Sequence, residues 1–118
     1  MATEERLLNK VCVPCRGDEP PLEKQEIHEF QKQVPDWEVV VVKEVPRLKR
    51  LFKFKDFAKA LTFTQKVGEL AEEQGHHPKL VTEWGKVTVS WWTHKIKGLH
   101  QNDFIMAAKS DELYSNLG

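Results

Sequence analysis

The spacing of apolar residues divides the first half of the chain into one helix and two strands. Apolar residues at helical intervals predict a helix over residues 22–33. Four consecutive valines make residues 37–43 the clearest strand, and alternation over residues 47–55 predicts a second strand, whose apolar face Arg50 interrupts. With a turn at residues 44–46 between them, the two runs are expected to form an antiparallel hairpin.

The second half of the chain predicts a long helix, a further hairpin and a last helix, over residues 57–74, 79–84, 86–94 and 100–117. Asp56 is a good N-cap for the long helix, and Gly75 is a good stop because glycine readily takes the left-handed conformation. The apolar side chains of this helix cover one broad arc that we expect to be buried: Phe57, Ala60, Leu61, Phe63, Val67, Leu70 and Ala71.

The resulting order of elements is α-β-β-α-β-β-α. Two hairpins separated by a helix predict an α+β fold, with one four-stranded antiparallel sheet and the helices packed on one face. A chain of 118 residues is large enough for one core and too small for two independent domains. Residues 1–21 are rich in Pro and Cys and lack periodicity, so we expect an irregular N-terminal arm, followed by a single domain over residues 22–118.

Composition and charge narrow the classes of function. Hydrophobic residues make up 40% and charged residues 31% of the chain, as in an ordinary globular protein. Because 18 Lys and Arg balance 18 Asp and Glu, we expect no direct binding of nucleic acid driven by overall charge. The apolar runs are far shorter than the ~20 residues of a membrane span. The acidic start without an apolar signal core predicts a cytoplasmic protein, with the nucleus as a second location.

Three histidines occupy the ends of predicted elements, where polar side chains can converge on one cleft. His76-His77-Pro78 follows directly on the helix stop, and His94 ends a predicted strand. Imidazole titrates near neutral pH, so such a cluster can supply both a general acid and a general base. Since neither a nucleophile motif nor a glycine-rich phosphate loop is present, a proton transfer or dehydration fits better than acyl or phosphoryl transfer.

Each of these features also has a purely structural interpretation. A histidine at a helix end often interacts with the helix dipole. Cys12-x-x-Cys15 could be half of a zinc site, a redox pair or two free cysteines. The basic residues between Lys43 and Lys55 could bind phosphate or form a solvated strand face. Trp37 could be a core residue or the wall of a pocket for a flat heterocycle.

Two spaced motifs resemble those of the pterin-4a-carbinolamine dehydratases. They are Glu72-x-x-x-His76-His77-Pro78 and Thr93-His94-x-x-x-Gly98-Leu99-x-x-x-Asp103. Pro35-Asp36-Trp37 and the junction from Phe52 to Phe57 are similar to the family as well, and the likeness extends over residues 22–114. His100 stands where a Ser or Thr N-cap is common, so Asp103 could either contact the pocket or favour the helix N-terminus.

The resemblance implies the same order of elements and a lyase activity: the dehydration of 4a-hydroxytetrahydropterin to quinonoid dihydropterin in tetrahydrobiopterin recycling, without metal or cofactor. By position, His76 and His94 would be the catalytic acid/base pair. The residues matching substrate contacts or the pocket around them are His77, Glu72, Pro78, Trp37 and Asp103. A carboxylate such as Glu72 could hold one imidazole protonated while the other stays neutral.

The resemblance also implies partners. The pterin would be the substrate, and aromatic amino acid hydroxylases would produce it. Family members form oligomers through the long helix, so a homodimer or homotetramer is expected. Animal members also serve as dimerisation cofactors of a homeodomain transcription factor, which makes a protein-interaction module the alternative function.

Overall fold

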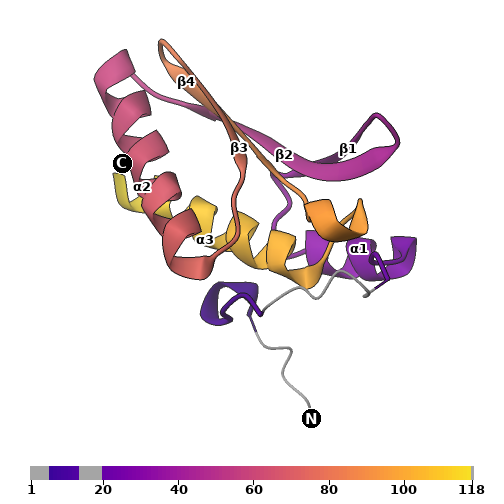
Figure 1. The fold of residues 1–118 in the computed structure, drawn as a ribbon. Coiled ribbons are helices and arrows are strands. Elements are labelled where there is room, and N and C mark those ends of the chain that lie inside the picture. Colours follow the sequence, from indigo (N-terminus) through magenta and orange to yellow (C-terminus); the bar gives the residue numbers. More distant parts are fainter. Residues whose placement is uncertain (1–5, 14–19, 118) are drawn as a thin grey trace.

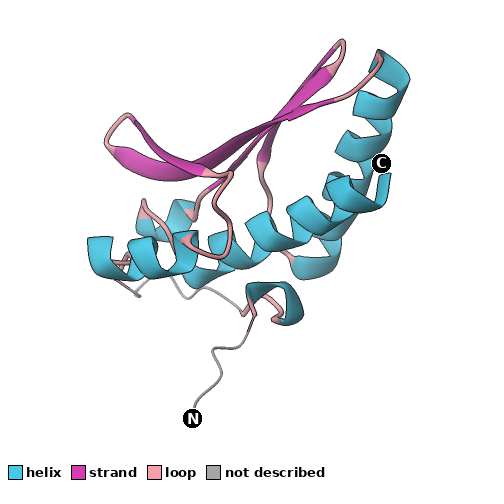
Figure 2. Cartoon of the chain, turned by 180° about the vertical axis from the view of Figure 1, so that it is seen from behind, coloured by secondary structure: helices cyan, strands magenta, loops and turns pink. Residues whose placement is uncertain are grey.

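The computed structural model describes residues 6–13 and 20–117. Its elements, in chain order, are the 3-10 helix η1 (Leu7–Asn9), α1 (Lys24–Gln31), β1 (Glu38–Val42), β2 (Val45–Lys53), α2 (Phe57–Gln74), β3 (Lys79–Glu83), β4 (Lys86–Trp91), the 3-10 helix η2 (His94–Ile96) and α3 (Gln101–Leu117). The four strands pair antiparallel in the order β1-β2-β4-β3. The helices lie on one face of this sheet (Figures 1 and 2), which confirms the predicted α+β fold.

The limits of α2 follow from two local signals that the sequence carries. The side chain of Asp56 accepts a hydrogen bond from the backbone N–H of Lys59 at 2.8 Å, and Gly75 ends the helix in the left-handed conformation with φ 67°. The predicted apolar arc was too broad, because Phe57 and Leu61 are 44% and 51% exposed. The helix therefore buries a narrower stripe against the sheet and leaves apolar side chains facing solvent.

The hairpin of β1 and β2 turns one residue earlier than expected. Lys43 and Glu44 form the turn, both with positive φ, and Val42 pairs with Val45. Such two-residue turns suit the right-handed twist of the flanking strands. Pro46 is accommodated in β2 because the pairing of β2 with β4 begins only at Leu48.

The core lies between the inner face of the sheet and the helices. The alternation predicted for β4 is confirmed, because Val87, Val89 and Trp91 are fully buried. They pack with core side chains of β2, α2 and α3, namely Leu48, Phe52, Ala60, Phe63, Val67, Ala71, Phe104 and Ala107. No helix in the described ranges is long and apolar enough to cross a membrane.

Arg50, which interrupts the apolar face of β2, is held inside the fold. Its guanidinium lies 4.4 Å from the ring centre of Phe52 and donates to Asp111 Oδ1 at 2.6 Å. The indole Nε1 of Trp37 donates to the same oxygen at 2.8 Å. Burial raises the pKa of Asp111, against the opposing effects of the Trp37 hydrogen bond and the charge of Arg50. Trp37 is thus a fully buried core residue anchored to α3.

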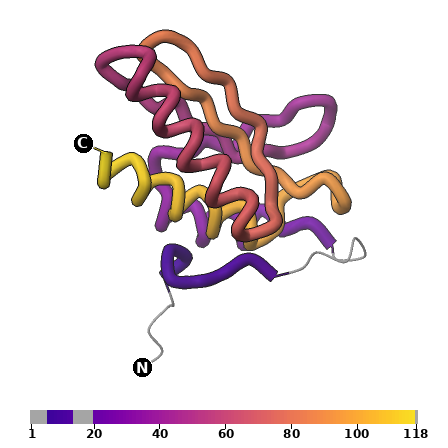
Figure 3. The backbone as a smooth tube through the Cα atoms, turned by 60° about the vertical axis from the view of Figure 1, so that its left-hand side comes forward, coloured from indigo at the N-terminus to yellow at the C-terminus, as the bar shows by residue number. Residues whose placement is uncertain are grey.

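The described part of the N-terminal arm is more ordered than its sequence indicates. Leu7 is part of the hydrophobic core, and its backbone N–H donates to the side chain of Gln33 at 2.9 Å. The ammonium group of Lys109 donates to the carbonyl of Leu8 at 3.0 Å. Figure 3 shows this segment, in indigo, passing beside the end of α2 and the start of α3.

Candidate active site

A cleft of about 420 Å³ brings the three singled-out histidines together. It lies where the end of α2, the loop containing η2, the start of α3 and the N-terminal segment meet. The residues that line it are Cys12, Val13, Gln74, Gly75, His76, His77, Thr93, His94, Lys95 and Asn102. Of the seven predicted site residues, His76, His77 and His94 line the cleft directly, while Asp103 and Glu72 reach it through hydrogen bonds to histidines.

His94 reaches the cleft from a short closed loop and not from a strand end as expected. β4 ends at Trp91, and His94 is the first residue of η2. Thr93 and Gly98 close this loop through a bridge in which Thr93 N–H donates to the Gly98 carbonyl at 2.9 Å. The ring of His94 is exposed, and its centre lies 4.7 Å from the centre of the Trp92 ring. On Trp92, the guanidinium carbon of Arg47 lies 3.8 Å from the ring centre.

His76 is paired with a fully buried carboxylate. Its Nε2 lies 2.6 Å from Asp103 Oδ1, and the two side chains are 13% and 0% exposed. The other oxygen of Asp103 accepts from the Thr93 hydroxyl and from the His100 backbone N–H, both at 2.9 Å. Because Asp103 is surrounded by donors, it is the acceptor, and Nε2 of His76 carries the proton. This fixes the tautomer, so Nδ1 is the nitrogen left for chemistry, and no described residue hydrogen-bonds to it.

Asp103 also stabilises the start of α3, so its two proposed roles coincide. His100 takes the place of the usual N-cap, because its Nδ1 accepts from the backbone N–H of Asn102 at 3.0 Å. Asp103, three residues on, accepts from the backbone N–H of His100 in return. This reciprocal pattern is a capping box with unusual residues. The helix start therefore fixes the carboxylate that orients His76.

Glu72 pairs with His77 and not with His76. Its Oε2 lies 2.5 Å from His77 Nε2, and the two side chains are 79% and 62% exposed. The reason is local, because Gly75 takes the left-handed conformation and the chain leaves the helix before His76. The pairing of i and i+4 side chains within a helix therefore does not extend to His76. Glu72 thus holds an imidazole, that of His77, while the carboxylate held against His76 is Asp103.

Two further predicted contacts lie outside the lining of the cleft. Trp37 lies in the core, where it packs edge-on against Phe52 with ring centres 5.8 Å apart. The structure thus does not bring it to the histidines, since the partner of its indole is Asp111 on α3. Pro78 is half-buried and joins His77 to β3, where it stiffens the backbone.

Several residues of the cleft carry no signal of their own in the sequence. Cys12 and Val13 belong to the arm, for which no role was derived, although the Cys12-x-x-Cys15 motif marked the region. Burial and, to a smaller extent, the charge of Asp103 raise the pKa of the Cys12 thiol to about 11, against the opposing effect of Lys109. The thiol is therefore neutral at physiological pH. Cys15 lies outside the described residues, and within them no group of three or more His, Cys, Asp or Glu could hold a metal ion.

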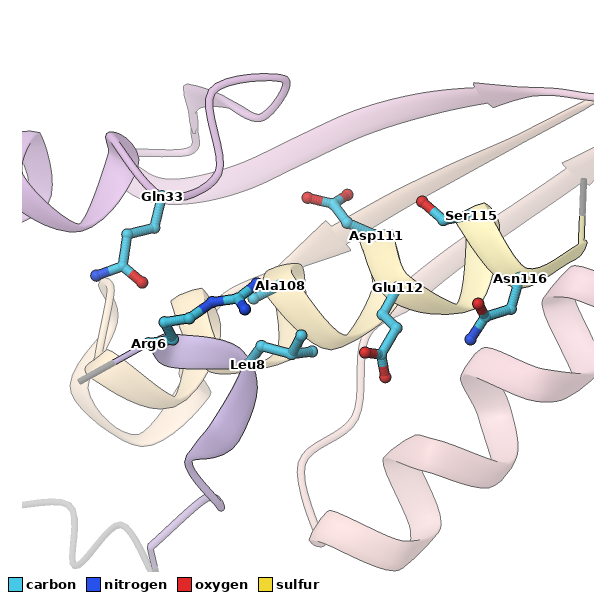
Figure 4. A pocket seen from close by; sticks show the side chains of 8 residues that line it. All are labelled: Arg6, Leu8, Gln33, Ala108, Asp111, Glu112, Ser115 and Asn116. Atoms are coloured by element: carbon cyan, nitrogen blue, oxygen red, sulfur yellow. The ribbon is translucent and has the colours of Figure 1, made fainter.

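A larger hollow of about 630 Å³ lies along α3, and none of the predicted site residues lines it. Figure 4 shows its lining, with Arg6 and Leu8 from the N-terminal segment, Gln33, and a row of α3 side chains that includes Asp111 and Glu112. None of the three singled-out histidines lines it, and its carboxylate Asp111 is already bound by Arg50 and Trp37. The smaller cleft is therefore the candidate active site.

Comparisons with known proteins identify the family to which the chain belongs. The sequence model of the family described as pterin 4 alpha carbinolamine dehydratase matches residues 20–113. A curated protein of Nitrosococcus oceani, assigned by name to these dehydratases, is 59% identical over 109 residues, which cover 92% of this chain and 96% of the relative. A similarly named protein of Syntrophotalea carbinolica is 55% identical over 109 residues, with 92% and 97% coverage.

Solved structures show the same fold. A crystal structure described as a transcriptional coactivator/pterin dehydratase from Brucella melitensis superposes with a TM-score of 0.71 at 30% identity, covering 79% of this chain and 97% of the other. A pterin dehydratase-like protein described as a RuBisCO assembly factor of the alpha-carboxysome has a TM-score of 0.57 at 22% identity, covers 67% and 89%, and shares the fold. The chain belongs to the pterin 4 alpha carbinolamine dehydratase family, a family of hydro-lyases.

Proposed function

We propose that this protein dehydrates a 4a-hydroxytetrahydropterin to the quinonoid dihydropterin, as in tetrahydrobiopterin recycling, by general acid–base catalysis with His76 and His94. The observation that carries the proposal is the buried pair of His76 and Asp103, which opens on a cleft shared with His94. A histidine held by a carboxylate is a common device for proton transfer. Family membership supports the substrate class.

The reaction needs two proton movements. The bond between C4a and the hydroxyl oxygen breaks, and the oxygen leaves as water after taking up one proton. A ring nitrogen loses its proton and supplies the electron pair that becomes the new double bond. The atoms therefore balance with one acid and one base, and the reaction needs no oxidant or reductant.

The two histidines differ in ways that suit these two tasks. At His76, Nδ1 accepts the proton from the ring nitrogen, and the Asp103 carboxylate at Nε2 stabilises the imidazolium that forms. His94 is exposed and pairs with no carboxylate of the described chain, so it exchanges protons readily with water and donates one to the departing hydroxyl. His77, held by Glu72 at the cleft's edge, contacts the bound pterin.

The direct test is a stopped-flow dehydration assay with chemically generated carbinolamine. His76→Ala and His94→Ala are each expected to lower the rate constant by roughly 10²–10⁴-fold. The double variant should approach the uncatalysed rate. His28→Ala is the matched control, because His28 is an exposed histidine on α1 that lines no part of the cleft. Wild-type turnover by the double variant would contradict the proposal.

We also propose a homodimer or homotetramer formed through α2, which could offer the same surface to another protein. Phe57 and Leu61 support this, because they are large apolar side chains left exposed on one helix. Leu61→Glu is expected to give monomers by light scattering, whereas Lys66→Glu, a charge change at an exposed position of the same helix, should leave the assembly intact. An unchanged assembly in Leu61→Glu would reject this interface. We place the activity in the cytoplasm, which cell fractionation tests.

A further inference from the structure

We propose that the N-terminal segment from Leu7 to Val13 is a substrate-contacting wall of the catalytic cleft, in which Cys12 and Val13 set the affinity for the pterin and the selectivity for its side chain. This inference rests on the proposed dehydratase function. Its starting observation is that Cys12 and Val13 line the same cleft as His76, His77 and His94. The family match begins at residue 20, so this wall lies outside the part of the chain that the family model describes.

The segment is anchored by residues that neighbour the catalytic pair. The backbone N–H of Cys12 donates to the Gln74 side chain at 2.9 Å, and Gln74 stands two residues before His76. The backbone N–H of Val13 donates to Asn102 Oδ1 at 3.0 Å, and the Asn102 amide donates back to the Val13 carbonyl at 2.7 Å. The two elements that position His76 and Asp103 therefore also position the wall.

These anchors make the segment a fixed part of the site. Asn102 is almost fully buried, and both hydrogen-bonding groups of the Val13 backbone are satisfied by its one side chain. Leu7, at the other end of the segment, is buried in the core. Because both ends of the segment are held, its side chains are already ordered before substrate binds, and binding costs little conformational entropy there.

The chemistry of the wall complements that of the histidines. Val13 is apolar, and the Cys12 thiol stays neutral because burial raises its pKa to about 11. The cleft thus combines these two uncharged groups with imidazoles, the ammonium group of Lys95 and polar side chains of α2, α3 and the η2 loop. A flat heterocycle with an apolar face and hydrogen-bonding edges fits such a lining. Side chains carried by the ring must then pass the wall or contact it, which makes the wall a filter for their size.

Point variants test the wall, because removing the segment would also remove Leu7 from the core. Val13→Ala is expected to raise KM roughly tenfold while kcat changes less than about twofold, since the wall binds substrate and takes no part in proton transfer. It should also favour bulkier substrates, measured as the ratio of kcat/KM for a carbinolamine with a dihydroxypropyl group to that for one with a methyl group. Val11→Ala is the matched control, because Val11 is the same residue type on the same segment and similarly exposed, at 65% against 54% for Val13, but does not line this cleft.

A second measurement reports on contact without turnover. In a Cys15→Ser background, alkylation of Cys12 by iodoacetamide at pH 9 is expected to slow several-fold when a saturating oxidised pterin is added, because the bound ring covers the thiol. Normal wild-type turnover with an unchanged KM in Val13→Ala and no protection of Cys12 would overturn the wall alone. A wild-type protein that neither turns over carbinolamine nor binds the pterin would overturn the proposed function, and the wall with it.

Discussion

Two neighbouring histidines form the same kind of pair in opposite surroundings. His76 and His77 each bring Nε2 to a carboxylate oxygen, at 2.6 Å from Asp103 and 2.5 Å from Glu72. The first pair is buried and its carboxylate accepts two further hydrogen bonds, whereas the second lies in solvent. Distance alone therefore does not distinguish the two pairs.

The difference shows that the role of a charge pair depends on its surroundings. Water and salt screen the exposed pair, so the attraction between Glu72 and His77 contributes little free energy. Inside the protein the same attraction is much stronger, and a buried carboxylate that lost its partners would be costly. Asp103 therefore fixes one tautomer of His76 and the orientation of its ring, which the proposed proton transfer requires.

Removing the carboxylate charge of Asp103 in the buried pair should have the largest effect on kcat. Asp103→Asn is expected to lower kcat by roughly 10²–10⁴-fold with a smaller change in KM, because the His76 tautomer is no longer fixed and its imidazolium loses the counter-charge. Asp103 is a positioning residue, so Asp103→Glu, which keeps a carboxylate, should recover part of the lost kcat, whereas a purely structural defect would not be rescued by restoring the charge.

The matched control for this variant is Asp36→Asn, which neutralises an aspartate that is 69% exposed. It should leave kcat unchanged. Thermal unfolding of both variants separates loss of catalysis from loss of fold, since Asp103→Asn also disturbs the capping box of α3. A kcat for Asp103→Asn within about threefold of the wild type would contradict the role of the buried pair.

The exposed histidine should act on binding and not on rate. His77→Ala is expected to raise KM roughly tenfold and to change kcat by less than about threefold, because in the proposed mechanism His77 contacts the pterin without exchanging its protons. Steady-state kinetics of His76→Ala and His77→Ala in parallel provide the comparison. An equal loss of kcat in both variants would show that the two adjacent histidines share one function.

Much of the fold is predictable because its signals are local. Asp56 and Gly75 define the limits of α2 by capping, and the alternation of β4 follows from which side chains face the core. The turn at Lys43 and Glu44 was not foreseen, because neither residue is glycine. Pro46 led to the prediction of a turn at residues 44–46 instead. The sequence offers no rule that makes two non-glycine residues adopt positive φ; the pairing of the strands imposes it.

The site was only partly predictable because its pairings are long-range. Three histidines at element ends indicated a cleft, but the choice between Glu72 and Asp103 depended on how Gly75 redirects the chain. The N-terminal wall depends on hydrogen bonds that span 62 and 89 residues, to Gln74 and Asn102. Sequence spacing says nothing about contacts at such separations.

The pKa of the Cys12 thiol can be used to compare the electrostatic effects of Asp103 and Glu72. The pKa of its thiol is raised to about 11, first by burial and then by the charge of Asp103. Asp103→Asn is therefore expected to lower the pKa of Cys12, while Glu72→Gln should leave it unchanged because solvent screens that charge. The pH dependence of iodoacetamide alkylation in a Cys15→Ser background measures it. Equal shifts in both variants would contradict the contrast between the pairs.

The upward shift of the Cys12 pKa also makes the stability of the fold depend on pH. Because the pKa of Cys12 in the folded protein lies above its ordinary value of 9.0, the folded state holds its proton more tightly than the unfolded chain does. The corresponding stabilisation is complete below pH 9.0 and is lost as the pH rises toward about 11. Cys12→Ser should flatten the fall in unfolding midpoint over this interval, and an unchanged slope would assign the fall to other groups.

Removing the charge of Glu72 in the exposed pair should have the smallest effect on the kinetic constants. Glu72→Gln is expected to change KM by less than about threefold, and the change should fade between 0.05 M and 0.5 M NaCl because mobile ions already screen a surface pair. The amide can still accept a hydrogen bond from His77, so what the variant removes is charge. A salt-independent loss of affinity would show that Glu72 touches the pterin directly, and the exposed pair would then belong to the binding machinery in its own right.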